Sequence, residues 1–551
     1  MPEVHTPGDA VSEHLANSGI DVVRVEERTF PGELFVIVSV APEDVRRASE
    51  ETYAFDDFDD ENVLITVRAA DPEERSKANK APVKGVSDLR VDEMQRLISS
   101  HSRSSLAQPS LQYIQDGPAN LSRLVSSRHC LIYGRRGAGK TSLLVEGRRA
   151  IESQGGVPIW LNMQPYRGYT AGAMVAAFAR LVLEELAQTM EEITRGPATQ
   201  SHGVASRLAE TLDRVRDIND VEADSPAWLP VEVNNRLREF SAATGKRVVV
   251  FIDDFYLFPP KVQPFILEGM HGCTRDTDTW LKVASVKHLT RAWDSESQSG
   301  LESPHDVEAI DLDVTLQEPE AATSFLIKIL ESYSIRASIP SLQSVFHRRA
   351  LDRLVFASGA VPRDYLVLAN RSIAEARRRS NARVVGVEDV NRAAGRASAE
   401  KRRELEEDLA AQSSEAAVTL EALSALRNFC LDRADAELWT YFRVSFNAKE
   451  SRQEEYALLT RLLEVRMVHM LDSSISDPKR AGIRFEVYML DLSEYSGQRL
   501  RRGVHVLNFE GGRLTAQKTG EPKSRREGKA ARDVTGIFRR APELELAVLA
   551  G

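Results

Sequence analysis

The octapeptide GRRGAGKT at residues 134–141 constrains the fold of this chain more than any other feature. It fits the pattern G-x-x-x-x-G-K-[ST], in which glycines let successive backbone N–H groups curve around phosphate oxygens. An apolar run, CLIY, precedes it and an amphipathic segment, TSLLVEGRRAIES, follows it. The pattern therefore predicts a phosphate-binding loop between a buried strand and the positive end of a helix. The expected nucleotide-binding residues are Gly134, Arg135, Arg136, Gly137, Ala138, Gly139, Lys140, Thr141 and Ser142.

A second motif supplies the acids that such a loop needs. The run VVVFIDD at 248–254 is an apolar strand that stops at two carboxylates. We expect Lys140 to bridge the β- and γ-phosphates, and Thr141 and Asp253 to hold Mg²⁺. Asp254 is expected to orient the attacking water. The predicted cofactors are ATP and Mg²⁺; the alternative is a strand that ends in a solvated turn.

Apolar runs of strand length alternate with longer helical patterns through the middle of the chain. The expected strands are 130–133, 157–162, 247–252, 281–286 and 307–312. Such alternation is typical of a parallel sheet with crossover helices, so the predicted fold class is α/β with a five-stranded parallel sheet. Residues 315–411 lose strand character and are expected to form an all-helical lid.

The remaining segments are expected to flank this core. The predicted divisions are a small α+β module at 1–70, a linker at 71–104, the core at 105–314, the lid at 315–411, a winged-helix-like domain at 412–514 and a basic tail at 515–551. The winged-helix prediction depends on helices at 417–430 and 452–471, followed by a hairpin of strands at 485–492 and 504–509. Within the second helix, Arg461 and Arg466 are expected to be exposed.

The extra strand at 157–162 and the paired acids resemble the additional-strand class of P-loop ATPases, which includes the AAA+ and STAND proteins. The helical end of the lid and the C-terminal pattern are similar to the origin-recognition AAA+ ATPases and a related STAND-like group, over roughly residues 105–510. This resemblance implies a first polar sensor at Ser285, Lys287 or His288. It also implies that Arg363, in SGAVPRD, reaches back to the nucleotide.

The implied catalytic set is therefore Asp254, Lys140, Ser285 and Arg363. The chain departs from the family in having aspartate at 254, where most members have the longer glutamate. We expect slow, switch-like hydrolysis for this reason. Arg291 and Arg275 are weak candidates for an arginine that reaches the γ-phosphate of a neighbouring subunit, and each is equally explained as a surface charge.

Charge and composition bear on partners. The formal net charge of -10 repels polyanions, so DNA binding would need a local basic face. Basic segments occur at 498–502 and 518–533, and they predict duplex DNA contact through residues 415–540, with a solvated tail as the alternative. We also expect a protein partner for residues 1–70 and self-association on ATP binding. The rival hypothesis is a STAND-like signalling or defence ATPase whose flanking domains bind proteins.

Localisation and cysteine chemistry follow from simpler patterns. The first residues lack the features of a signal or transit peptide, and the apolar stretch 171–186 is interrupted by Arg180 and two glutamates. We therefore expect a cytoplasmic protein that does not enter a membrane. Cys130, Cys273 and Cys430 lie far apart without a CxxC pattern, which argues against disulfides and a zinc site.

Overall fold

The computed structural model describes most of the chain. The described residues are 7–30, 33–42, 44–53, 63–70, 83–101, 113–114, 120–194, 201–216, 218, 226–410, 413–433, 437–477, 482–496, 503–511, 513–520 and 534–550. The chain divides into two compact units, the first comprising residues 1–84 with 334–344 and the second comprising residues 85–333 with 345–551. The acidic stretch at 55–62 and the basic stretches at 498–502 and 521–533 lie outside the described residues.

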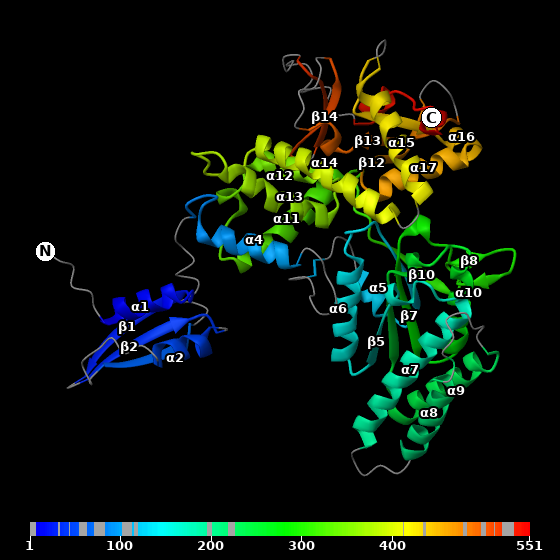
Figure 1. Cartoon of the computed structure of the whole chain (residues 1–551), viewed down its shortest axis with the longest axis horizontal. Helices are drawn as coiled ribbons and strands as arrows, with labels where there is room; N and C mark the ends of the chain where they lie inside the picture. The colour runs from blue at the N-terminus through cyan, green and yellow to red at the C-terminus, as the bar shows by residue number, and fades with distance from the viewer. Residues whose placement is uncertain are drawn as a thin grey trace. The chain divides into compact units, whose positions relative to one another are not determined.

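The first unit contains a small α+β module (Figure 1). Its elements are α1 (Pro7–Asn17), β1 (Val22–Phe30), β2 (Glu33–Val40), α2 (Val45–Tyr53) and β3 (Val63–Ala69). Strand β2 is central, antiparallel to β1 and parallel to β3. Alternate residues of β2, Val36 and Val38, are fully buried against Val11 and Leu15 of α1. Burial at every second residue is what one covered face of a sheet requires.

A five-stranded parallel sheet forms the centre of the second unit. Its strands are β4 (His129–Tyr133), β5 (Val157–Asn162), β6 (Val248–Asp253), β7 (Thr279–Ser285) and β10 (Val307–Asp311). They lie in the order β10-β4-β7-β6-β5, and every neighbouring pair is parallel. The prediction of a five-stranded parallel α/β core is confirmed. A short hairpin, β8 (Trp293–Asp294) with β9 (Ser299–Gly300), follows β7.

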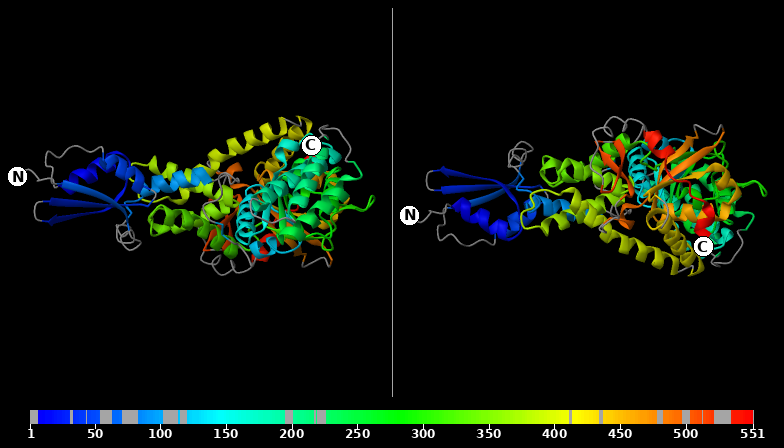
Figure 2. Two further views of the ribbon diagram at one scale, coloured as in Figure 1. Left: turned by 90° about the horizontal axis from the view of Figure 1, so that it is seen from below. Right: turned by 90° about the horizontal axis from the view of Figure 1, so that it is seen from above.

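Helices cover both faces of this sheet (Figures 1 and 2). They are α5 (Asn120–Leu124), α6 (Lys140–Ser153), α7 (Ala171–Thr194), α8 (Ser201–Arg216), α9 (Leu229–Thr244) and α10 (Gln263–Thr274). Leu131 of β4 packs in the core shared with α7–α10, whereas its neighbours Cys130 and Ile132 pack against α6. Both faces of β4 are therefore apolar, as expected for a sheet that is covered on two sides.

The lid consists of α11 (Pro319–Arg336), α12 (Arg348–Ala357), α13 (Pro362–Arg377) and α14 (Val387–Ala410). A further helix, α4 (Leu89–His101), packs against α13. Gln95 Nε2 donates to Asn370 Oδ1 at 2.6 Å, and Arg377 pairs with Asp92 at 2.6 Å. The interval 71–104, expected to be a linker, thus includes a helix that belongs to the lid side of the second unit.

The C-terminal region (residues 413–550) is mixed α/β. Its elements are α15 (Ser413–Leu431), β11 (Tyr441–Ser445), α16 (Phe446–Ser451), α17 (Gln453–Glu464), β12 (Val468–Ser476), β13 (Arg484–Leu490), β14 (His505–Glu510), β15 (Arg513–Lys518) and α19 (Val534–Arg539). Strands β11, β13 and β12 form an antiparallel sheet with β13 in the middle. Strand β14 pairs with β15.

Two predictions for this region are wrong. The expected helix at 452–471 ends at Glu464, because Arg466 adopts a left-handed φ of 61° and the chain then enters β12. No glycine marks this turn, so the sequence carries no ordinary stop signal. The strands near 485–492 and 504–509 also do not pair with each other, since β13 pairs with β11 and β12. Arg466, expected to be exposed, is buried.

The described residues of the expected basic tail at 515–551 include regular structure. The end of β15 and the whole of α19 fall within them, and Leu544, Leu546 and Leu549 are buried. These residues belong to the short 3₁₀ helix Leu546–Ala550 or precede it, and that helix packs on α15 and α17. Among the described residues, no helix is both long enough and apolar enough to cross a bilayer.

Candidate nucleotide-binding site

The phosphate loop (residues 134–141) joins β4 to α6 at the carboxyl edge of the sheet. Gly137 and Gly139 have φ values of 86° and 104°, which side chains other than glycine rarely adopt. Helix α6 begins at Lys140, so its free backbone N–H groups face the loop. This is the geometry that a phosphate needs: converging N–H donors at a positive helix end.

Lys140 is held inside the loop. Its Nζ donates to Gly134 O at 2.7 Å and to Arg135 O at 3.1 Å, and the residue is only 7% exposed. Burial lowers the pKa of this ammonium, and the nearby carboxylates of Asp253 and Asp313 oppose that shift. The loop therefore concentrates a cation beside the helix N-terminus.

Asp253 meets the loop directly. It ends β6, and its Oδ2 accepts a hydrogen bond from Thr141 Oγ1 at 2.8 Å. Burial raises the pKa of Asp253 to about 6, the adjacent Asp254 adds to the increase, and Thr141 and Lys140 oppose it. A buried carboxylate with a raised pKa is a group whose charged form gains from a nearby cation.

Thr141 and Asp253 fit Mg²⁺. A hydroxyl and a carboxylate are oxygen ligands, and Mg²⁺ is usually held by only one or two carboxylates together with waters and substrate phosphates. No cluster of three or more histidine, cysteine, aspartate or glutamate side chains suited to a metal occurs in the described part of the chain. Thr141 and Asp253 therefore offer the kind of oxygen ligands that the predicted ion would need.

Asp254 follows in a left-handed conformation, with φ 59° and ψ 35°. Its side chain is partly buried, and burial raises its pKa, while Lys140, Arg136 and a hydrogen bond from Tyr256 oppose the increase. The guanidinium of Arg136 lies 5.6 Å from the centre of the Tyr256 ring. Sequence reasoning missed Tyr256, although its position two residues after the acids could have suggested it.

Arg363 lies against the loop as the first turn of α13 begins. Its backbone N donates to Gly137 O at 3.3 Å, and a Cβ added to Gly137 would come 2.8 Å from Arg363 Cβ. The loop also contacts the lid through Arg135, which donates to Gly359 O at 3.5 Å. Arg363, which the sequence predicts as the second sensor, therefore lies beside the phosphate loop.

Asp313 is a loop contact that the sequence did not predict. Its Oδ1 accepts from Arg135 N at 2.8 Å and from Arg135 Nε at 3.2 Å. Asp313 follows the edge strand β10, which pairs with β4 in register with the start of the loop. The sequence signal for this contact was the position of Asp313 directly after the predicted strand 307–312.

Ser285 and Lys287, two of the predicted first-sensor residues, bond to residues outside the phosphate loop. Ser285 ends β7 opposite Tyr133, but it is fully buried and its Oγ lies 2.5 Å from Thr290 Oγ1. Lys287 pairs instead with Asp311 at 3.2 Å. The side chain of His288 lies outside the described part of the structure. Neighbouring strands thus bring Ser285 to the correct sheet edge, with its hydroxyl bonded to Thr290.

The two arginine-finger candidates have local roles. Arg291 pairs with Asp294, three residues further on in the short hairpin. Arg275 ends α10, where its carbonyl accepts a hydrogen bond from Asn234 Nδ2 at 2.7 Å. Both observations agree with the interpretation as ordinary surface charges.

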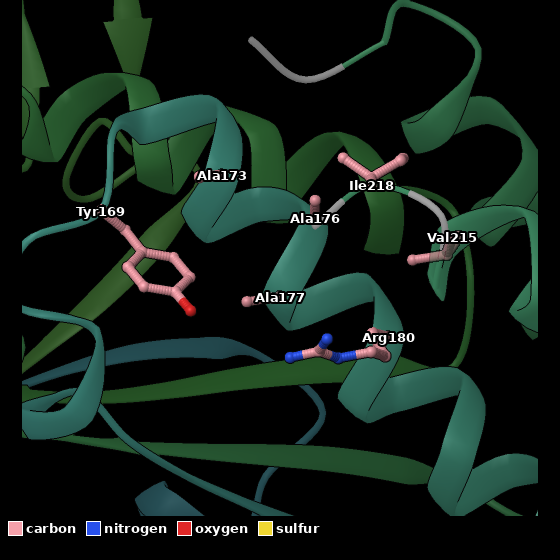
Figure 3. Close-up of a pocket in the computed structure, with 7 residues that line it drawn as sticks. All are labelled: Tyr169, Ala173, Ala176, Ala177, Arg180, Val215 and Ile218. Carbon is pink, nitrogen blue, oxygen red and sulfur yellow. The ribbon is translucent and has the colours of Figure 1, made fainter. Parts of the chain in front are cut away.

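A separate small pocket lies between α7 and the end of α8 (Figure 3). Tyr169, Arg180 and three alanines of α7 line it together with Val215 and Ile218. Its volume of about 20 Å³ suits a water molecule rather than a nucleotide. None of the predicted site residues lines it, so it is not part of the nucleotide site.

Comparisons with known proteins agree with this geometry. Residues 119–270 match the family model described as an AAA ATPase domain. No curated protein shows significant sequence similarity to the chain.

Two solved structures are similar in part. The Orc1 protein of Aeropyrum pernix, solved in complex with DNA, is 17% identical over 76% of this chain and 91% of its own, with a TM-score of 0.32. A Walker-type ATPase of Pyrococcus abyssi is 12% identical over 75% of this chain and 97% of its own, with a TM-score of 0.36. At TM-scores below 0.5, neither likeness bears on function. The five-stranded parallel sheet and the phosphate loop agree with the match of residues 119–270 to the AAA ATPase domain.

Proposed function

We propose that the protein is an ATP-binding, slowly hydrolysing switch in which the bound nucleotide controls assembly or engagement of a further partner. One observation carries the proposal: the 2.8 Å contact between Thr141 Oγ1 and Asp253 Oδ2. It joins the helix that starts at the phosphate loop to the acidic strand end, and both parts are needed for nucleotide hydrolysis.

Each residue has a separate task in this proposal. The loop amides and Lys140 bind the phosphates, and Thr141 and Asp253 hold Mg²⁺. Mg²⁺, when bound, neutralises negative charge on the phosphate oxygens. Asp254 orients a water and accepts its proton, while Arg363 contacts the γ-phosphate from the lid. Hydrolysis would remove the contact of Arg363 and so free the lid.

Slow turnover follows from the second acid. Asp254 is one methylene shorter than the glutamate at this position in most relatives of the class, and Tyr256 hydrogen-bonds it. Its carboxylate is therefore expected to lie further from the attacking water. A single-turnover measurement with excess protein should give slow phosphate release; a rate as fast as that of vigorous AAA+ motors would contradict this part of the proposal.

The output of the switch is what the bound nucleotide controls, and its first candidate is engagement of duplex DNA through the C-terminal region. The order α15–β11–α16–α17–β12–β13, with β13 between β11 and β12, supports a winged-helix-like domain in this proposal. The basic segments at 498–502 and 518–533 flank β14 and β15, and their charges would contact phosphates.

A protein partner is the second candidate, and a specific observation favours it. In a DNA-binding winged helix the helix equivalent to α17 enters the major groove, yet the first turn of α17 carries Glu454 and Glu455. Carboxylates on this helix would be repelled by DNA phosphates. The rival is therefore a STAND-like ATPase whose flanking domains bind proteins.

A salt titration separates the two outputs. Truncation after residue 514 would remove the buried leucines 544, 546 and 549, so the basic charges should instead be neutralised by substitution. Glutamine at Lys523, Arg525, Arg526 and Lys529 removes four positive charges from the full chain. The DNA output predicts salt-sensitive duplex binding that these changes weaken. Absence of salt-sensitive binding in the unmodified protein would select the protein-partner output.

The assembly part of the proposal has its own test. The mass of the full chain in solution should be larger with a non-hydrolysable ATP analogue and Mg²⁺ than with ADP and Mg²⁺. Equal masses at concentrations well above the nucleotide affinity would reject nucleotide-controlled self-association.

A further inference from the structure

The turn between α17 and β12 contacts the lid beside the phosphate loop. Arg466, in this turn, forms an ion pair with Asp364, and each side chain is 10% exposed. Asp364 directly follows Arg363 in the first turn of α13. Because Arg363 N donates to Gly137 O, Asp364 of the buried ion pair is the direct neighbour of a residue that contacts the phosphate loop.

A second contact is made by β12, which follows this turn, with the segment between α12 and α13. His469 of β12 packs so closely on Gly359 that an added Cβ would overlap its imidazole ring. His469 Nε2 is in turn hydrogen-bonded to Asp491 Oδ2 at 2.6 Å, with both side chains 1% exposed. Gly359 O accepts from Arg135 of the phosphate loop. The C-terminal region therefore fixes both sides of the lid turn that touches the loop.

We propose that the C-terminal region completes the nucleotide site. Arg466 acts as a positioning residue that holds Arg363 against the phosphate loop through Asp364. This inference rests on the proposed ATP switch and goes further, because it names the residues through which the nucleotide and the C-terminal region act on each other. Coupling of this kind is reciprocal: what the C-terminal region binds would alter nucleotide affinity equally.

The physical reason lies in the burial of the ion pair. Removing one partner of a buried pair leaves the other charge without compensation, so the surrounding elements shift to let water in. For Arg466 the element that shifts is the first turn of α13, which carries Arg363. The loss of nucleotide affinity in Arg466→Gln should therefore depend on whether the nucleotide carries a γ-phosphate. A merely structural role would change stability and leave the ratio of ATP to ADP affinity unaltered.

The test uses the full chain and two single variants. Arg466→Gln removes the buried charge, and Glu454→Gln is the control because Glu454 is exposed in the first turn of α17, the helix that precedes Arg466. Dissociation constants for MgATP and MgADP are measured by competition with a fluorescent nucleotide. kcat and KM are measured on the same samples.

We expect Arg466→Gln to weaken MgATP roughly fivefold more than MgADP. Glu454→Gln should match the unmodified protein. Asp364→Asn in the Arg466→Gln background should recover part of the ATP preference, since it removes the uncompensated carboxylate.

Equal changes in the affinities for MgATP and MgADP in Arg466→Gln would overturn the inference, and so would affinities that match those of Glu454→Gln. If Arg466→Gln does not fold, Asp364→Asn, which removes the other charge of the ion pair, decides by the same ratio of affinities. Failure of the underlying switch looks different, because then the unmodified protein itself binds MgATP no better than Lys140→Ala does.

Discussion

Replacement of Gly359 by alanine should loosen the lid from the C-terminal region. Gly359 has a φ of 56°, and the left-handed conformation costs an alanine about 1–2 kcal/mol. The new Cβ would also overlap His469, which cannot easily move because it is hydrogen-bonded to the buried Asp491. Overpacking of this kind typically costs about 1–3 kcal/mol more. The sum is a loss of about 2–5 kcal/mol in the free energy of unfolding.

Gly245→Ala is a matched control for the backbone term. Gly245 has a similar φ of 66°, and no atom lies within 4 Å of the position that its Cβ would take. This variant should lose only the first term, about 1–2 kcal/mol. The difference between the two variants therefore isolates the contact between Gly359 and His469.

Urea denaturation of both variants, followed by circular dichroism, measures that difference. Gly359→Ala should unfold at a distinctly lower urea concentration than Gly245→Ala. It should also bind MgATP more weakly, because the Gly359 carbonyl accepts from Arg135. Equal losses of stability in the two variants would refute the packing of β12 on the lid turn.

Three further outcomes follow from the same contacts. Asp253→Asn should lower the hydrolysis rate at least about 100-fold, and a melting curve without nucleotide should show a gain in stability because the buried charge is gone. Asp313→Asn should weaken MgATP binding about tenfold, as seen by calorimetry, because Arg135 loses a charged acceptor. Burial lowers the pKa of His129 to about 3, so near pH 5 the unfolded chain binds a proton at this residue that the folded chain does not. The free energy of unfolding should therefore be about 2 kcal/mol lower at pH 5 than above pH 6.5. His129→Gln should lack that decline in pH-dependent denaturation, whereas an identical decline would exclude His129 as its source.

The core of the fold was predictable because its signals are local. Each strand of the sheet is an apolar run next to a breaker, and GRRGAGKT requires a strand before it and a helix after it. The parallel arrangement then brings the ends of β4, β6 and β7 to one edge without further information. For that reason Thr141 and Asp253 meet, although 112 residues separate them in the sequence.

The C-terminal region was less predictable because its turn chemistry is unusual. Helix α17 is stopped by Arg466 in a left-handed conformation, which is normally a glycine position, and the apolar residues that follow fit a helix or a strand equally well. The structure stabilises this turn by the ion pair with Asp364, a contact across 102 residues. A local pattern cannot reveal such a long-range partner, so the helix was extended too far and Arg466 was assigned to the surface.

The hydrogen-bond partner of the predicted first sensor, Ser285, could not be predicted from the sequence either. Ser285 was chosen because it ends a strand beside the loop, and the structure has it there. Its hydroxyl direction depends on Thr290, which follows a short 3₁₀ turn whose path no periodic pattern specifies. Position along a strand is encoded by periodicity, whereas the hydrogen-bond partner of a side chain depends on the packing of several elements.

Equilibrium binding of a fluorescent ATP analogue with Mg²⁺ tests the central claim most directly. Lys140 is the cation of the phosphate loop, and loss of a charged hydrogen bond to phosphate is worth roughly a 10- to 150-fold change in affinity. The account predicts saturable binding by the unmodified chain and at least that loss in Lys140→Ala, with an unchanged circular dichroism spectrum. Equal affinity of the two proteins for the analogue would contradict the assignment of residues 134–141 as the nucleotide site.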